Sequence, residues 1–288
     1  MERLLEEVGF FAPRSLEEAL TMRAAHRNAR VIAGGTDVMV WQEQGRVPLP
    51  DAYLSVWGLP ELQGIRRTAE RLEVGALTTY HELIQSAEVR GLYPALAEAS
   101  RWVGAAQIQN RGTIGGNVVN GSPAGDTLPV LAVAGAELVV ESLARGRRRV
   151  PFGSFYTGYR KTALAFDELL VRIDLPIPPE DSRGAFAKVG SRRAQTISKV
   201  MAAIQARCDD QGRMLEVALA YGAVAPVVLR LPETEAALTG KRPSPELADN
   251  VASVLGREIA PIDDVRSSVD YRRFLAVGLL RRMLRGWA

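Results

Sequence analysis

Cysteine is nearly absent from this chain, which has a single one, Cys208, among 288 residues. One cysteine excludes a disulfide within the chain, and it excludes an iron–sulfur cluster or a zinc site held by four cysteines of this chain. Histidine is also scarce: only His26 and His81 occur, so no histidine pair close in sequence indicates a metal site. Any redox chemistry here must therefore use a group other than cysteine.

Several motifs of nucleotide-binding and hydrolytic enzymes are missing as well. No two glycines are separated by a single residue, which excludes the GxGxxG fingerprint of a Rossmann site. The sequence contains no Walker lysine loop, no GxSxG elbow and no HExxH helix. A Rossmann nucleotide site and a hydrolase are therefore poor interpretations.

Long apolar runs are lacking too. The longest, Leu128 to Val140, is interrupted by Glu137 and is too short to cross a bilayer. The first residues, MERLLEEVGF, carry acids where a secretory signal would carry positive charge. We therefore expect no membrane span, no export and a cytoplasmic location.

Charge of one sign is not in excess. Lysine and arginine total 36 against 33 acidic residues, for a net charge of +3. This balance does not favour nucleic acid as a partner. The basic clusters at Arg145–Arg149 and along the C-terminus are more often solvated surface than a partner surface, although both interpretations stay open.

What the sequence does have is glycine in two short stretches. Residues 111–126, RGTIGGNVVNGSPAGD, contain five glycines, and residues 30–37, RVIAGGTD, run from a short apolar strand into Gly34 and Gly35. Glycine is needed where the chain takes positive φ or where backbone must approach another group closely. Successive exposed amides form an anion-binding nest, so two such turns could hold one extended polyanion. A run of tight turns without a ligand is the alternative.

The remaining pattern predicts two domains, since 288 residues exceed most single cores. Pro48 and Pro50 mark the edge of a first lobe at about 1–55, and a second lobe follows over about 56–178. Three prolines between 176 and 179 resemble a linker to a second domain at 179–288.

Local signals predict the elements of both parts. Ser15 with Glu18 three residues on indicates a helix running to about His26, followed by a strand at 30–33. A helical segment after residue 80 should break near Gly91 and Pro94. Residues 128–142 read as a buried helix or a strand pair, and the basic run 145–162 as a turn-rich loop. The sequence pattern of the second domain predicts an antiparallel sheet packed against an amphipathic terminal helix.

Taken in order, these motifs resemble a known family. IAGGTD at 32–37, VGALTT at 74–79, TIGGNVVNGSPAGDTLP at 113–129 and ELLVRIDLP followed by FAKVGSRRAQTISKV are similar to the FAD-binding subunit of the molybdenum hydroxylases. That family includes xanthine dehydrogenases and aerobic carbon monoxide dehydrogenases. The resemblance covers nearly the whole chain. It implies an α+β fold, with a two-lobed FAD-binding domain of the vanillyl-alcohol-oxidase (PCMH) type and a C-terminal α+β domain.

The resemblance also implies which residues touch FAD. The first group would offer amides and hydroxyls to the pyrophosphate and ribityl chain: Ile32, Ala33, Gly34, Gly35, Thr36, Asp37, Thr113, Gly115, Gly116 and Asn117. Val119 would touch the flavin side, Asp126 would accept a hydrogen bond from the cofactor, and Leu170 and Lys188 would complete the pocket. Arg192 and Ile197 lie where the family brings a mobile loop over the ring. We expect positive φ at Gly35 and Gly115, and no protein acid, nucleophile or metal ligand.

By the same resemblance, this chain is an oxidoreductase subunit that passes electrons from [2Fe–2S] clusters through FAD to an external acceptor. A molybdenum-pterin large subunit and a [2Fe–2S] small subunit would be its partners, in a dimer of heterotrimers. Three alternatives stay open. They are a stand-alone flavin reductase of related fold, of the cell-wall enolpyruvyl reductase type, a nucleotide-binding module without redox function, and, least favoured, a nucleic-acid-binding protein.

Overall fold

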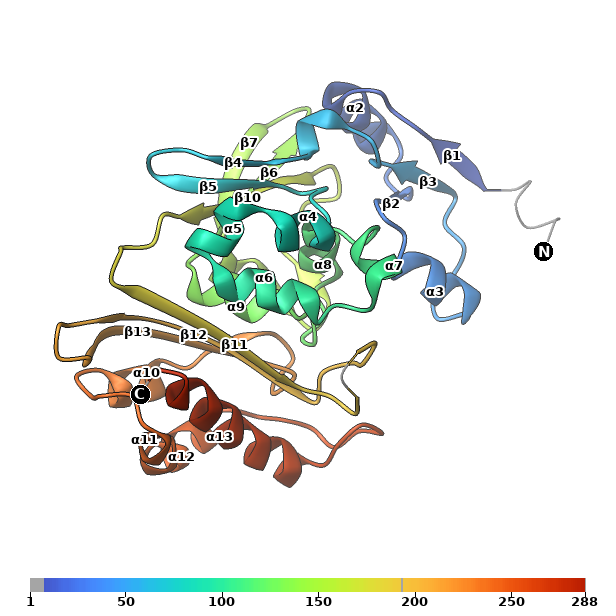
Figure 1. Ribbon diagram of the computed structural model, residues 1–288. Coiled ribbons are helices and arrows are strands. Elements are labelled where there is room, and N and C mark those ends of the chain that lie inside the picture. The colour runs from blue at the N-terminus through green and yellow to red at the C-terminus, as the bar shows by residue number, and fades with distance from the viewer. Residues whose placement is uncertain (1–7, 193, 288) are drawn as a thin grey trace.

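The chain folds as layers of sheets and helices. Its structure, a computed structural model, describes residues 8–192 and 194–287. A small sheet with two helices lies at the N-terminal side, a larger sheet covers a middle layer of helices, and a third sheet with its own helices lies below them (Figure 1). Helices and strands are mixed but the sheets are mostly antiparallel, which confirms the predicted α+β class.

The first sheet is short and parallel. Its order is β1 (Gly9–Phe11), β3 (Ala52–Ser55) and β2 (Arg30–Ile32). Helix α2 (Leu16–Ala25) begins as predicted, because the Ser15 hydroxyl accepts a hydrogen bond from the Glu18 amide at 3.2 Å. The sequence did not predict β1, whose three residues carry no alternation long enough to recognise.

A short helix follows the first glycine turn. This is helix α3 (Val38–Glu43). Met39 and Val40 on this helix are 54% and 43% exposed. Its apolar residues are therefore not part of the core of this lobe.

The second sheet has five antiparallel strands. Their order is β4 (Ile65–Arg67), β5 (Arg71–Gly75), β10 (Leu169–Pro176), β6 (Glu137–Ser142) and β7 (Gly146–Pro151). The prediction of a turn-rich loop over 145–162 was wrong for 146–151, which form the edge strand β7. The reason is charge pairing across strands: Arg148 Nε donates to Glu168 at 2.7 Å, and Arg149 Nη1 donates to the buried Asp174 at 2.7 Å.

Six helices form the middle layer beneath this sheet (Figure 1). They are α4 (Tyr80–Gln85), α5 (Ala87–Leu92), α6 (Pro94–Arg101), α7 (Ala106–Gln109), α8 (Ile114–Asn120) and α9 (Leu128–Val133). The predicted break lies at Tyr93, directly before the proline that starts α6. Residues 128–142 form a helix, α9, followed by the strand β6, rather than the single helix or the strand pair that the sequence predicted.

A hairpin and two single turns complete the first half. The hairpin consists of β8 (Tyr156–Gly158) and β9 (Lys161–Thr162), and the 3-10 turns are η1 (Pro60–Leu62) and η2 (Phe152–Ser154). The Tyr156 hydroxyl donates to the Val118 carbonyl oxygen at 2.9 Å, which holds the hairpin against α8.

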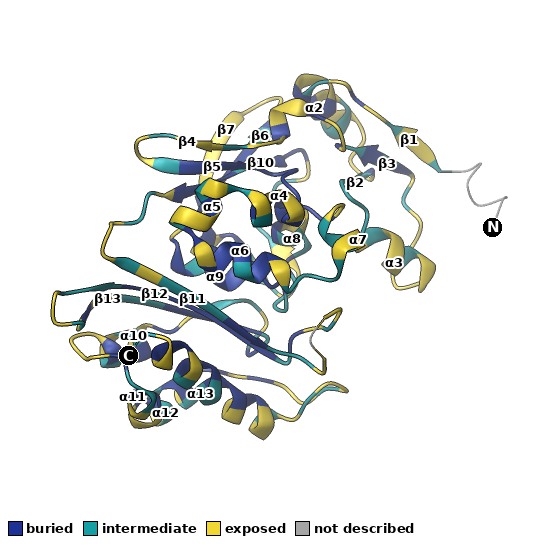
Figure 2. Cartoon of the chain, viewed as in Figure 1, coloured by how far each residue is buried: buried dark blue, intermediate teal, exposed yellow. Residues whose placement is uncertain are grey.

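The third sheet is antiparallel, as predicted. Its order is β11 (Ser182–Val189), β12 (Val200–Cys208), β13 (Met214–Gly222) and β14 (Leu229–Arg230). One face contacts α6 and α9, and the other carries α10 (Pro232–Leu238), α11 (Pro245–Asn250), α12 (Ala252–Glu258) and α13 (Val269–Arg285). The long terminal helix buries Leu275, Leu279 and Met283 and exposes Phe274, so the predicted amphipathic helix is confirmed (Figure 2). Within the described residues, none of the helices is both long and apolar enough to cross a membrane.

One buried cation joins the terminal helix to the third sheet. Arg272 is 3% exposed; its Nη1 donates to the carbonyl oxygens of Lys199 and Ala223, and its Nη2 donates to Asp264 at 2.7 Å. Buried carbonyl groups that lose their donors are costly. Arg272 therefore fixes the end of the loop between β11 and β12 onto α13.

We predict that Arg272→Met lowers the free energy of unfolding by about 2–4 kcal/mol, because a carboxylate and two carbonyl groups lose their partner. The neighbouring Arg273 is exposed, so Arg273→Met removes the same charge from the helix surface and serves as the control. Urea unfolding followed by circular dichroism measures both. Equal stability of the two variants would contradict the assignment.

Candidate functional site

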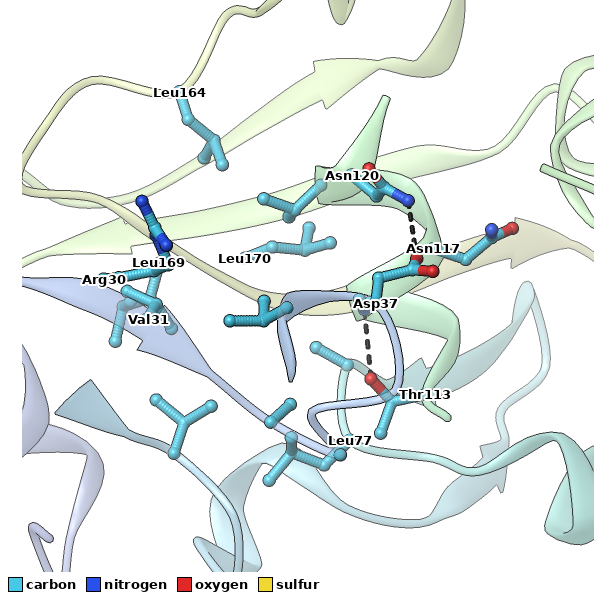
Figure 3. A pocket seen from close by; sticks show the side chains of 18 of the residues that line it. Arg30, Val31, Asp37, Leu77, Thr113, Asn117, Asn120, Leu164, Leu169 and Leu170 are labelled. Atoms are coloured by element: carbon cyan, nitrogen blue, oxygen red, sulfur yellow. Dashed lines mark hydrogen bonds between the residues drawn. The ribbon is translucent and has the colours of Figure 1, made fainter. Parts of the chain in front are cut away.

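A cleft of about 510 Å³ lies between the first, parallel lobe and the second sheet with α8. This volume is within the range of about 300–1,000 Å³ that is usual for cofactor sites. Both glycine stretches line it, together with the start of β10 (Figure 3). Eleven of the predicted site residues line the cleft: Ala33, Gly34, Gly35, Thr36, Asp37, Thr113, Gly115, Gly116, Asn117, Val119 and Leu170.

The first glycine turn supplies free backbone donors. Gly35 has φ +75°, as expected, and a Cβ on Gly34 would lie 1.7 Å from the Arg111 carbonyl oxygen. Within the described part of the chain, the amides of residues 34–37 donate to no protein acceptor. Four unpaired amides in one turn form the concave nest that binds anions. This turn therefore fits a pyrophosphate group.

The second glycine stretch is the start of helix α8, and its amides are already used. The Thr113 hydroxyl accepts from the Gly116 amide at 3.0 Å, and the Gly115 amide donates to the Ala76 carbonyl oxygen at 2.9 Å. The expectation of positive φ at Gly115 was wrong, because this residue lies within the helix. Glycine is required for closeness instead: a Cβ there would lie 2.5 Å from the Ala76 carbonyl oxygen. This stretch therefore contributes close packing and side chains to the cleft but, among the described residues, no nest of free amides for an anion.

The rest of the cleft is mostly apolar. Figure 3 shows Val31, Leu77, Leu164, Leu169 and Leu170 along it, with Thr113, Asn117 and Asn120 near the glycine turn. Flat apolar walls beside a few polar groups suit the aromatic rings of a dinucleotide. The amides of the turn and these walls together fit FAD, whose charge lies in its centre and whose rings lie at its ends.

Four predicted residues lie outside the cleft lining. Ile32 belongs to β2, behind the glycine turn. Asp126 and Lys188 pair with each other, Oδ2 to Nζ at 2.6 Å, and both are buried. Ile197 is 55% exposed on the loop between β11 and β12.

The buried pair fixes that loop. Ser198, one residue after Ile197, donates its hydroxyl to Asp126 Oδ1 at 2.7 Å. Burial raises the pKa of the Asp126 carboxyl, while the Lys188 ammonium and the Ser198 hydroxyl oppose this rise. Arg192, on the same loop, donates to the carbonyl oxygens of Ala194 and Gln195 and so stabilises the loop itself. The segments that carry Asp126, Lys188 and Ser198 thus meet at the buried Asp126 carboxylate.

Sequence reasoning missed several lining residues. Arg23 and Arg30 come from α2 and β2, and Leu164, Phe166 and Leu169 come from the segment entering β10. None of these residues is a glycine or belongs to a recognisable motif. Only the fold therefore shows that they line the cleft. Within the described ranges, moreover, there is no cluster of three or more His, Cys, Asp or Glu residues that could hold a metal ion.

Two family models match this chain. The FAD binding domain in molybdopterin dehydrogenase matches residues 6–178, and the CO dehydrogenase flavoprotein C-terminal domain matches residues 185–286. The carbon monoxide dehydrogenase medium chain of Hydrogenophaga pseudoflava is 30% identical over 282 residues, which cover 97% of this chain and 96% of that one. The glyceraldehyde dehydrogenase medium chain of Sulfolobus acidocaldarius is 31% identical and covers 93% of each chain.

Solved structures agree with the sequence matches. A carbon monoxide dehydrogenase from Hydrogenophaga pseudoflava, which lacks the Mo-pyranopterin moiety of its cofactor, has a chain similar with a TM-score of 0.90 and 29% identity, over 96% of this chain and 95% of that one. Quinoline 2-oxidoreductase from Pseudomonas putida 86 has a chain similar with a TM-score of 0.90 and 28% identity, over the same shares. The predicted fold is confirmed by these structures, and this chain belongs to the family of FAD-binding subunits of the molybdenum hydroxylases.

Proposed function

We propose that this chain holds FAD in the cleft between its two N-terminal lobes and passes electrons from [2Fe–2S] clusters to an external acceptor. The chain is an oxidoreductase subunit whose relatives are medium chains of multi-subunit enzymes. The observation that carries the site assignment is the turn at 34–37, whose unpaired amides face no protein acceptor among the described residues.

FAD, when bound, supplies the electron carrier, and the chain's own residues bind and orient it. Amides 34–37 would hold the pyrophosphate, and the Thr113 hydroxyl and Asn117 would contact the polar linker. Val119 at the rim and Leu170 on the wall would exclude water from the rings. We propose that Asp126 accepts a hydrogen bond from the ring end of the cofactor. The Asp126–Lys188 pair would also hold the loop that carries Ile197 toward the ring.

The wider assembly is part of the same proposal. We expect a molybdenum-pterin large subunit and a [2Fe–2S] small subunit as partners, in a dimer of heterotrimers. We also expect two domains, 1–178 and 179–288, with the first divided near residue 55. A cytoplasmic location stays a prediction.

Copurification tests the function directly. The tagged chain, isolated from its native cell, should bring two partners, one with molybdenum and one with [2Fe–2S] clusters, and the complex should show flavin absorption bands. A complex without flavin absorption would contradict the proposal. Full turnover of a small substrate by the isolated chain would favour a stand-alone flavin reductase instead.

Substitution of the close-packed glycines should reduce FAD content. Gly35→Ala places a side chain at positive φ, and Gly115→Ala brings a Cβ to 2.5 Å from the Ala76 carbonyl oxygen. Each should cost about 1–3 kcal/mol at the cleft, which corresponds to a loss of FAD affinity of about fivefold to 150-fold. Gly256→Ala is the control, because an added Cβ on helix α12 has open space among the described residues. Flavin absorbance per folded chain measures all three.

If Gly35→Ala and Gly115→Ala retain as much FAD as the Gly256→Ala control, the cleft is not the cofactor site. Thermal melting of each variant shows whether a loss of flavin comes from the cleft or from general unfolding.

The buried pair predicts a non-additive result. Lys188→Met leaves the Asp126 carboxylate buried without its cation, and Asp126→Asn leaves the Lys188 ammonium without its anion. Each single change should lower the free energy of unfolding by about 3–5 kcal/mol. The double variant should lose clearly less than the sum, since no buried charge remains unpaired. Urea unfolding of the three variants measures this coupling, and simple additivity would show that the two groups do not depend on each other.

A further inference from the structure

One wall of the cofactor cleft is held much less firmly than the others. Residues 35–45, which we name the α3 flap, contain the glycine turn's second half and all of α3. Each of the six residues of α3 is at least partly exposed. By contrast, helix α8, which contributes Gly116 and Asn117 to another wall, is held in the core by the fully buried Ile114 and Val118. Segments with few buried apolar contacts open at low free-energy cost.

Glycines with positive φ stand at both ends of this flap. Gly35 has φ +75° and Gly45 has φ +63°. Backbone changes during loop movements are usually absorbed by a few residues at the ends of the moving segment. The two glycines thus give the flap a hinge on each side. Thr36, Asp37, Val38 and Trp41 between them line the cleft, so movement of the flap would open the site.

Four polar and aromatic groups hold the flap to the second lobe. Asn120 Nδ2 donates to Asp37 Oδ2 at 2.6 Å (Figure 3), and Arg160 Nη1 donates to Asn120 Oδ1 at 2.8 Å. The Arg160 guanidinium also lies over the Trp41 ring, 4.8 Å from its centroid. We name this chain of contacts the latch.

The first residue of the latch is diverted from another role. Asp37 occupies the N-cap position of α3, where an aspartate normally accepts from the helix's own amides. Among the described residues its carboxylate bonds to Asn120 instead, across the cleft. Loss of hydration beside the cleft raises the pKa of Asp37, although the residue keeps exposed surface, and the Arg160 charge and the Asn120 amide oppose the rise. The helix therefore gives up a local cap for a contact between lobes.

The last residue of the latch is held in an unusual backbone conformation. Arg160 has φ +52°, in the turn of the hairpin formed by β8 and β9. A residue other than glycine is disfavoured at this positive φ and keeps it only when its surroundings hold it in place. The hairpin is fixed to α8 through Tyr156 and Val118, so Arg160 is presented to the flap from a firm support.

From these contacts we propose that the α3 flap is a gate of the cofactor cleft, and that the latch sets the rate at which FAD enters and leaves. This inference rests on the proposed function, because it takes the cleft as the FAD site. Arg160 and Trp41 are positioning residues in this account. The latch would keep FAD in place between turnovers while still allowing the folded chain to take it up.

The test uses the full chain and FAD itself as the probe. Arg160→Gln keeps a polar side chain, two atoms shorter, but removes the charge over Trp41, and Trp41→Leu removes the ring. Arg90→Gln removes an exposed arginine from α5, far along the chain from the flap, and is the control. Stopped-flow measurement of flavin fluorescence gives both the association and the dissociation rate.

A gate makes a specific prediction. Both latch variants should bind and release FAD about fivefold faster than the wild-type chain and the control, so the rates rise more than the equilibrium affinity changes. The double variant should exchange FAD no faster than the faster of the two single variants, since both changes break the same contact between Arg160 and Trp41. Unchanged rates, or a faster dissociation alone, would overturn the gate, because the second result describes a residue that simply contacts the cofactor.

A measurement without cofactor separates this inference from the proposed function. Hydrogen exchange of the amides at 38–45 should be faster in both latch variants than in Arg90→Gln, and unchanged exchange would overturn the latch. If the wild-type chain in its complex binds no FAD while the exchange result holds, the latch stands as a structural device and the proposed function fails.

Discussion

The close approach of backbone to backbone at two glycines determines the shape of the site. Gly34 lies against the Arg111 carbonyl group, and Gly115 lies against Ala76, in each case with no room for a Cβ. The first contact joins the small parallel lobe to the segment before α8, and the second joins α8 to the large sheet. Because neither contact leaves room for a side chain, the first fixes the distance between the lobes and the second fixes α8 against the sheet, and together they set the width of the cleft.

The glycine signal predicted that the two stretches lie at one cleft but not how each stretch works. In sequence, GGTD and TIGG look alike, as two glycine turns with a threonine. In the structure, only the first leaves its amides unpaired, whereas the second begins a helix whose amides bond to Thr113, Thr78 and Ala76. Hydrogen-bond partners that are distant in sequence decide the difference, and no local pattern reports them.

Charged residues were harder to interpret than glycines for the same reason. The arginines at 145–149 read as a solvated loop, yet Arg147, Arg148 and Arg149 belong to an edge strand, because acids on β6, on β10 and in the segment entering β10 pair with them. Asp126 and Lys188, 62 residues apart, pair in the interior and hold the loop after β11. The resemblance to a family placed both near the cofactor, but only the structure shows that they bond to each other. Pairing decides whether a charge is buried, and pairing is a property of the fold.

A chain that binds a cofactor and passes electrons has to meet two demands that oppose each other. The rings need firm walls so that their surroundings stay dry and constant, and the cofactor needs a way in after the chain has folded. The described structure separates these demands in space. The buried Leu169 and Leu170 of β10 line one wall together with helix α8, which the core holds in place, while the wall at α3 depends on a carboxylate, an amide, a guanidinium and one aromatic ring. Contacts of this kind are individually weak and exchange readily with water, so they can be broken without unfolding the core. The polar wall is therefore the one that can move.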